Sequence, residues 1–211
     1  MLRRLVISGA AVCAVIATVG IAQADGAETP NAAAAAVHVS VLDRAVPVIP
    51  AGDKAGQSAA TTSPSLDATG RNAVTQALQI SHLDPARTSA VLARTTPAGA
   101  VYITTDPDGS MCVVLARTAN DVAFSCTTKA ILAQRAAFLG FSADGSSIDA
   151  ILVSADGFNE ATFTSASTGA AVNASITDNV TYWKISPDQT EISLKGQSGT
   201  QTFSLGNLGR K

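Results

Sequence analysis

The chain has 211 residues, and its 14 Lys and Arg against 16 Asp and Glu give a formal net charge of −2. No basic patch accompanies this mild acidity, so the composition argues against a nucleic-acid-binding protein. Aromatic residues make up 4% of the chain and do not cluster, which argues against an aromatic platform for carbohydrate.

The first 24 residues have the pattern of a secretory signal peptide. Two arginines near the start precede an uncharged apolar run, and Ala22-Gln23-Ala24 offers an A-x-A cleavage site. Cleavage would remove Cys13 and both arginines, leaving two cysteines and a formal charge of −4. The alternative is an uncleaved anchor, because an apolar run of roughly 18 residues is near the lower limit for a membrane span. We predict an exported protein, extracellular or in the cell envelope, that contacts the membrane only if this segment is retained.

Residues 25–66 are predicted to form a low-complexity or extended linker, rich in Ala, Gly, Ser and Thr. Within it, Val37–Val41 alternates apolar and polar residues as an extended edge segment does. Val46–Pro50 can also be extended, but its prolines exclude a central strand because proline donates no ladder hydrogen bond. We expect this segment to pack on the surface of the following domain without extending its central sheet.

Two short helices are predicted next. Apolar residues recur at helical spacing after Asp67, at Ala73, Val74, Ala77 and Leu78. Asp84-Pro85 then resembles an N-cap with proline at the first helical position, and it predicts a helix over 86–94 with Val91 and Leu92 facing inward. His82 lies between the two helices and is expected to contact solvent or a helix end.

Residues Ser110–Thr127 predict a β-hairpin closed by a disulfide between Cys112 and Cys126. Placing the cysteines opposite each other also pairs Val114 with Phe124 on the same face, and it leaves a short loop at Asn120. In an oxidising compartment, a loop of about 15 residues closed in this way is worth about 3 kcal/mol. The alternative is two buried, unpaired thiols.

The remainder of residues 67–211 predicts a single β-rich domain with one core. Turn residues divide it into short strands, and one more short helix is expected over 128–138. The predicted fold is therefore mainly β, an antiparallel β-sandwich or barrel with two or three short helices. Trp183 is expected in the core. The predicted strands are 100–105, 148–153, 160–165, 170–177, 180–185, 191–195 and 200–205.

Acidic residues are the main candidates for chemistry. Asp144, Asp149, Asp156 and Glu160 are close in sequence and could serve a secreted hydrolase, as paired carboxylates do in glycosidases. However, Asp144 and Asp156 each lie in a Ser-Ala-Asp-Gly turn, where a local hydrogen bond from the backbone accounts for the aspartate.

The other candidate sites lack essential parts. Asp106-Pro107-Asp108-Gly109 begins like a calcium loop but lacks the distal glutamate. His38 and His82 are far apart in sequence and have no neighbouring metal ligands. No G-x-S-x-G motif or serine and histidine pair suggests a catalytic triad. We therefore predict no catalytic, metal or cofactor-binding residues, only the disulfide.

Several short motifs stand out: Val41-Leu42-Asp43-Arg44, Asp84-Pro85-Ala86-Arg87, the cysteine pair, 153–158, 162–164, 171–173 and Asp178-Asn179-Val180-Thr181-Tyr182. They resemble motifs in a group of exported actinobacterial proteins of unknown function. The resemblance covers residues 38–185, although Ser154 and Ala155 replace the proline expected before Asp156. It implies export and a similar fold, and it carries no activity that could be transferred. We expect a non-enzymatic secreted or envelope-associated β domain whose partner would be a cell-envelope or extracellular protein. The alternative is a secreted hydrolase that uses loop carboxylates.

Overall fold

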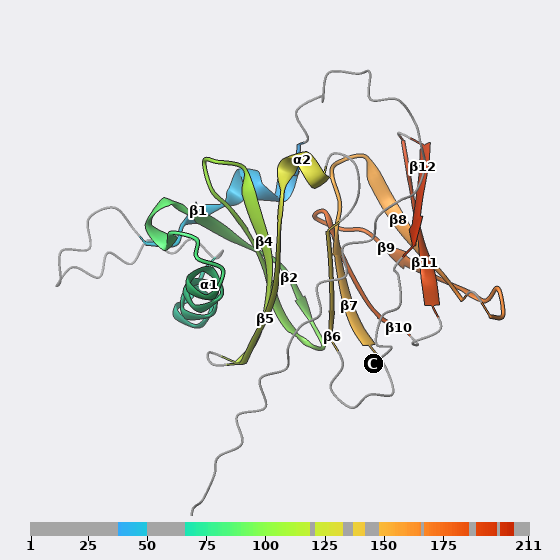
Figure 1. The fold of residues 1–211 in the computed structure, drawn as a ribbon, viewed down its shortest axis with the longest axis horizontal. Helices are drawn as coiled ribbons and strands as arrows, with labels where there is room; N and C mark the ends of the chain where they lie inside the picture. Colours follow the sequence, from blue (N-terminus) through green and yellow to red (C-terminus); the bar gives the residue numbers. More distant parts are fainter. Residues whose placement is uncertain are drawn as a thin grey trace, which may run out of the picture.

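A computed structural model describes residues 38–49, 66–118, 121–132, 137–141, 148–165, 167–185, 189–197 and 199–204. Within them the protein is mainly antiparallel β, as the sequence predicts, and its strands form three open sheets. Helix α1 and the sheets form successive layers in Figure 1, with α1 at the left and β12 at the right. The predicted signal peptide, most of the predicted linker and Asp144 lie outside the described residues.

The first sheet has five strands in the order β1-β2-β3-β4-β5. Each strand pairs antiparallel with its neighbour, and both faces of the central strands are buried. The bounds are β1 Val46–Pro47, β2 Ser89–Thr96, β3 Gly99–Thr105, β4 Ser110–Thr118 and β5 Asp121–Thr128.

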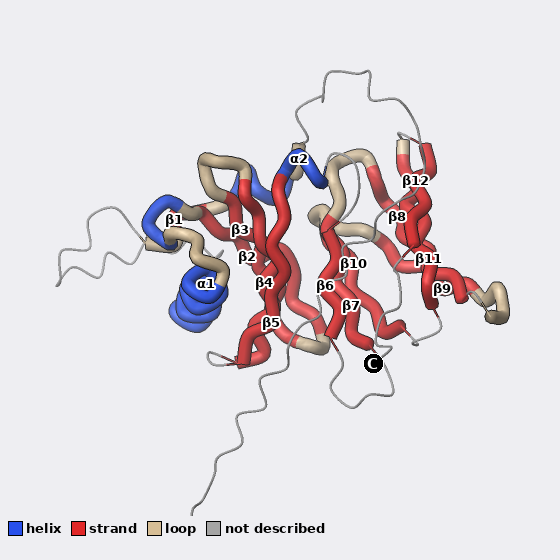
Figure 2. Tube along the Cα trace, viewed as in Figure 1, coloured by secondary structure: helices blue, strands red, loops and turns tan. Residues whose placement is uncertain are grey.

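The second and third sheets follow in sequence and are connected through the turn between β7 and β8. The second has the order β10-β7-β6 and the third the order β12-β11-β8-β9. Figure 2 shows the strands of both in red, to the right of the first sheet. The bounds are β6 Ala137–Phe141, β7 Ile148–Val153, β8 Phe158–Ser165, β9 Ala171–Ser175, β10 Val180–Ile185, β11 Gln189–Gly196 and β12 Gly199–Ser204.

The first predicted helix is confirmed as α1, Ala68–Ile80. Asp67 caps it by accepting a hydrogen bond from the Gly70 N–H at 2.7 Å. Its apolar stripe covers the face of the first sheet that carries Tyr102 and Val114, which excludes water from that face. The buried residues of the stripe are those predicted: Ala73, Val74, Ala77 and Leu78.

The predicted helix over 86–94 is wrong. Asp84 does accept a hydrogen bond from the Ala86 N–H at 2.9 Å, but the helical turn η2 ends at Arg87 and residues 89–96 form β2. Val91 pairs with Ile103 in a strand whose two faces are both covered. Such a strand has no simple alternation, so its apolar run was read as part of a helix.

The disulfide hairpin is confirmed. Cys112 pairs with Cys126 and Val114 with Phe124, and the two sulfurs are bonded at 2.07 Å. Beyond Ala116 the register shifts by one residue, so that Thr118, rather than Arg117, lies opposite Asp121. Such a bond is typical of an oxidising environment.

The short helix predicted over 128–138 is only partly correct. The helical turn α2 covers Lys129–Leu132, whereas Ala137 and Phe138 belong to strand β6, which pairs with β7. Local spacing favoured one continuous helix here, but the pairing with β7 determines the conformation of the second half.

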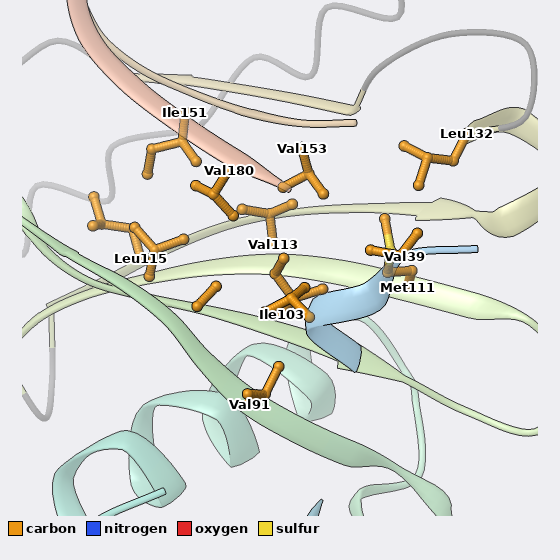
Figure 3. Close-up of a cluster of buried hydrophobic side chains, with 13 residues drawn as sticks. Val39, Val91, Ile103, Met111, Val113, Leu115, Leu132, Ile151, Val153 and Val180 are labelled. Carbon is orange, nitrogen blue, oxygen red and sulfur yellow. The ribbon is translucent and has the colours of Figure 1, made fainter. Parts of the chain in front are cut away.

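Three clusters of buried residues, rather than the single expected core, lie between the layers of the described structure. One lies between α1 and the first sheet, and another between the first and second sheets (Figure 3). The third lies between the second and third sheets, where Trp183 is buried as predicted and stacks on Phe163. A strand between two such clusters is apolar on both faces.

Candidate functional site

Polar side chains from distant parts of the chain meet at one corner of the second sheet. His38, Ser40 and Asp43 belong to the N-terminal segment, Asp156 lies in the turn between β7 and β8, and Asn179 lies in the turn between β9 and β10. We call these five residues the His38 cluster. It is a meeting of three segments, so local sequence reasoning could not assemble it.

The N-terminal segment is fixed at this corner by apolar anchors. Val39 and Val41 are 3% and 1% exposed and lie in the cluster between the first two sheets, where Figure 3 shows Val39 beside Met111. After Val39 the chain forms the 3₁₀ helix η1, Ser40–Arg44, which contains Val41. This segment was expected to be extended and to lie on the surface. That expectation is wrong, because burial of the two valines favours the helical turn over an extended surface segment.

The end of the same segment also departs from the prediction. Val46 and Pro47 form the two-residue edge strand β1, which pairs with β2, so the segment does extend the first sheet. Proline is tolerated there because its missing N–H faces away from the ladder at an edge. As predicted, Val46 and Pro47 do not form a central strand. The prediction that this segment would not extend the sheet was wrong.

Asn179 is the centre of the hydrogen-bond network. Its Oδ1 accepts from the Val41 N–H at 3.0 Å and from the Ser40 hydroxyl at 3.1 Å. Its Nδ2 donates to the Ser154 carbonyl at 3.2 Å and to Asp156 Oδ1 at 2.7 Å. Asn179 has a φ of 63°, a left-handed conformation that asparagine tolerates better than most residues, and it is buried.

Asp156 is stabilised as a carboxylate. Partial burial alone would raise its pKa, but hydrogen bonds from Asn179, from the Ser40 N–H at 3.0 Å and from His38 outweigh that effect. Together they lower the pKa of Asp156 to about 2. The negative charge is therefore retained at any ordinary pH.

His38 lies between two carboxylates. Its Nδ1 lies 2.5 Å from Asp156 Oδ2, and its Nε2 lies 3.2 Å from Asp43 Oδ1. The hydrogen bond with Asp156 and then the charge of Asp43 raise the pKa of His38 above its ordinary value. When protonated, the imidazolium donates from both ring nitrogens, one to each carboxylate.

The arrangement is suited to holding segments together rather than to activating a nucleophile. Both nitrogens of His38 are taken by carboxylates, and the Ser40 hydroxyl donates to Asn179 instead of to His38. A nucleophile and its base need a direct hydrogen bond. In the described part of the chain, no group of three or more His, Cys, Asp or Glu side chains could hold a metal ion.

The three carboxylates singled out in the sequence that the structure describes, Asp149, Asp156 and Glu160, do not converge. Asp149 is buried at the start of β7 and accepts a hydrogen bond from the Tyr182 hydroxyl at 2.7 Å. Burial and then this hydrogen bond raise the pKa of Tyr182 to about 12. Asp156 follows the other end of β7, and the strand alone separates Asp149 from Val153 by about 13 Å at about 3.3 Å per residue. Glu160 lies opposite Lys195 in the third sheet.

The remaining candidates have local roles. Asp106 accepts a hydrogen bond from the Ser110 N–H at 2.8 Å within its turn, and Asp108 forms an ion pair with Arg87 at 3.0 Å. Gly109 has a φ of 86°, which explains why glycine ends this turn. His82 is exposed in the turn after α1. None of these residues contacts the His38 cluster through a described hydrogen bond.

Three of the motifs that carry the resemblance meet at the His38 cluster: residues 41–44, the turn at Asp156 and the turn at Asp178-Asn179. Arg44 and Asp178 add an exposed ion pair at 3.3 Å. Sequence reasoning identified each motif separately and assigned Asp156 to a local turn. All three motifs are polar turns that belong to the same resemblance, and this was the only sequence feature that linked them. Their spacing along the chain does not show that they are in contact.

Comparisons with protein-family models, with curated proteins and with solved structures find no match for this chain. None of the helices in the described ranges is both long and apolar enough to cross a membrane.

Proposed function

We propose that this chain is an exported, non-enzymatic β-sandwich protein that acts by binding or shielding in the medium or the cell envelope. The observation that carries the proposal is the role of the His38 cluster. The cluster holds the N-terminal segment against the second sheet. It does so with an imidazole, carboxylates and an amide, which are side-chain types from which catalytic sites are built.

The geometry favours a durable scaffold over a reaction centre. The disulfide joins two strands of the first sheet beneath α1, and the His38 cluster ties the segment before α1 to turns more than a hundred residues later. Both devices stabilise a chain that works outside the cytosol, where disulfides persist. The resemblance to exported actinobacterial proteins and the signal-peptide pattern support the same location.

Export is tested by expressing the full chain with a C-terminal tag in an actinobacterial host. We expect the protein in the medium or the envelope fraction, beginning at Asp25, with no free thiol under denaturing conditions until a reductant is added. Ala24→Arg is the matched variant, because it should block cleavage and leave the chain in the membrane. A reduced, uncleaved chain in the cytosol would contradict the proposal.

The alternative, a secreted hydrolase, is tested on the same medium. Replacing Asp144, Asp156 and Glu160 by their amides should leave every hydrolytic activity of the medium unchanged. Asn179→Gly is the control, because it weakens the cluster without removing a carboxylate. An activity that is lost with the amides and kept in the control would establish the hydrolase instead.

A further inference from the structure

We propose that strand β9 is a docking edge for a second copy of this chain, so that two third sheets join into one continuous antiparallel sheet. β9 is the outer strand of the order β12-β11-β8-β9, and its described partner is β8 alone. Figure 2 shows β9 running to the end of the molecule, away from α1. The inference concerns assembly and does not depend on export.

The hydrogen bonds at both ends of β9 show which backbone groups point outward. Ser165 N–H donates to the Ala170 carbonyl at 2.8 Å, and Ile176 N–H donates to the Asn159 carbonyl at 2.9 Å. Both pairs belong to the same antiparallel register. Since hydrogen-bonded pairs alternate in such a ladder, even-numbered residues of β9 bond to β8. The N–H and C=O groups of the odd-numbered residues therefore point to the free edge.

Those odd-numbered residues are Ala171, Asn173 and Ser175, and they define a self-complementary edge. An antiparallel copy centred on Asn173 places Asn173 opposite its own equivalent and Ala171 opposite Ser175. This register uses every outward-pointing group of the strand and forms about six backbone hydrogen bonds. A twofold axis beside Asn173 closes the assembly at a dimer.

The side chains fit the same register. Val172 is 43% exposed, although it shares a face with Ala174 and Phe163 of the buried layer. In the paired register Val172 lies opposite Ala174 of the partner copy, so pairing covers the exposed valine. Residues 169–177 contain neither a charge nor a proline. Charged residues and prolines usually protect edge strands against pairing with another chain. Because β9 has neither, a second copy meets no like-charge repulsion here.

The first test measures association of the purified full chain by sedimentation equilibrium over a wide concentration range. We expect a reversible dimer, weak because a single strand pair makes a small interface. Asn173→Lys should weaken it at least about tenfold by placing two ammonium groups opposite each other. Thr202→Lys on β12 is the matched control, because both residues are exposed and belong to one cross-strand row.

The second test reads the register directly by cysteine cross-linking. Asn173→Cys should oxidise to a covalent dimer by itself, since directly opposed residues lie within disulfide reach. Ala171→Cys and Ser175→Cys should cross-link efficiently only when the two variants are mixed. Thr202→Cys should remain monomeric.

Three results would overturn the proposal. One is a wild-type chain that stays monomeric at every concentration, and another is a dimer that Asn173→Lys leaves intact. The third is a dimer that Thr202→Lys weakens instead, because it would assign the interface to β12. Circular dichroism of each variant shows whether it folds, and the cross-linking series still reads the register if a lysine variant does not.

Discussion

Replacing Asn179 by glycine should weaken the attachment of the N-terminal segment. Glycine keeps the left-handed backbone at a φ of 63° and removes only the side chain. The loss is four hydrogen bonds, and it leaves the Val41 N–H and the Ser154 carbonyl without their partner. At about 1 kcal/mol for each bond, less what water recovers near the exposed Ser40, we expect a loss of about 2 to 3 kcal/mol.

The neighbouring residue supplies the control. Asp178 has a φ of 50° in the same turn, but its side chain makes an exposed ion pair with Arg44. Asp178→Gly should therefore change the free energy of unfolding by less than about 1 kcal/mol. The difference between the two glycine variants isolates the network from the conformation of the turn.

Urea unfolding followed by tryptophan fluorescence gives both free energies, and limited proteolysis shows where the structure opens. In Asn179→Gly, we expect faster cleavage at residues 38–44, because only the burial of Val39 and Val41 and the hydrogen bonds to Asp156 then hold the segment. If Asn179→Gly unfolds within about 0.5 kcal/mol of Asp178→Gly and is cleaved no faster, the network does not hold the segment.

Four further predictions concern Gly70, the two titrating residues of the His38 cluster and the disulfide. Gly70→Ala should destabilise the protein by about 1 to 3 kcal/mol, although alanine favours helices, because the added Cβ would lie 2.3 to 2.6 Å from the Tyr102 hydroxyl and ring. In a Tyr102→Leu background, thermal melting should show the same change to be neutral or stabilising. The stability contributed by Asp156 should be full above pH 3.8 and should fall as the pH drops toward its folded pKa of about 2. We expect this loss of stability to be about 1 kcal/mol, because the carboxylate is more than a third exposed. The stability contributed by His38 has the opposite pH dependence: it is full below pH 6.5 and is lost as the pH rises through the raised pKa of His38. A His38→Gln variant that unfolds with the wild-type pH profile would contradict this contribution. Replacing both cysteines of the β4–β5 disulfide by alanine should cost about 3 kcal/mol in chemical unfolding, and an unchanged midpoint would refute that value.

Local signals accounted for much of the fold. The pairing of Cys112 with Cys126 followed from one register that suited the cysteines, the apolar face and the turn together. Helix α1 followed from its apolar spacing and the Asp67 cap, and most later strands followed from alternation between turns. All of these features depend on residues within about 15 positions of one another, where spacing and turn chemistry are decisive.

Tertiary contacts decided the rest. Strand β2 was read as a helix because burial on both faces by different layers removes the alternation that marks a strand. The His38 cluster was not anticipated because His38 and Asp156 are 118 residues apart, and no local pattern indicates such a pair. The sequence by itself determined the elements whose partners are near in the chain. Only the folded structure decided which segments share an interface, because burial and charge depend on neighbours that the chain brings together over long distances.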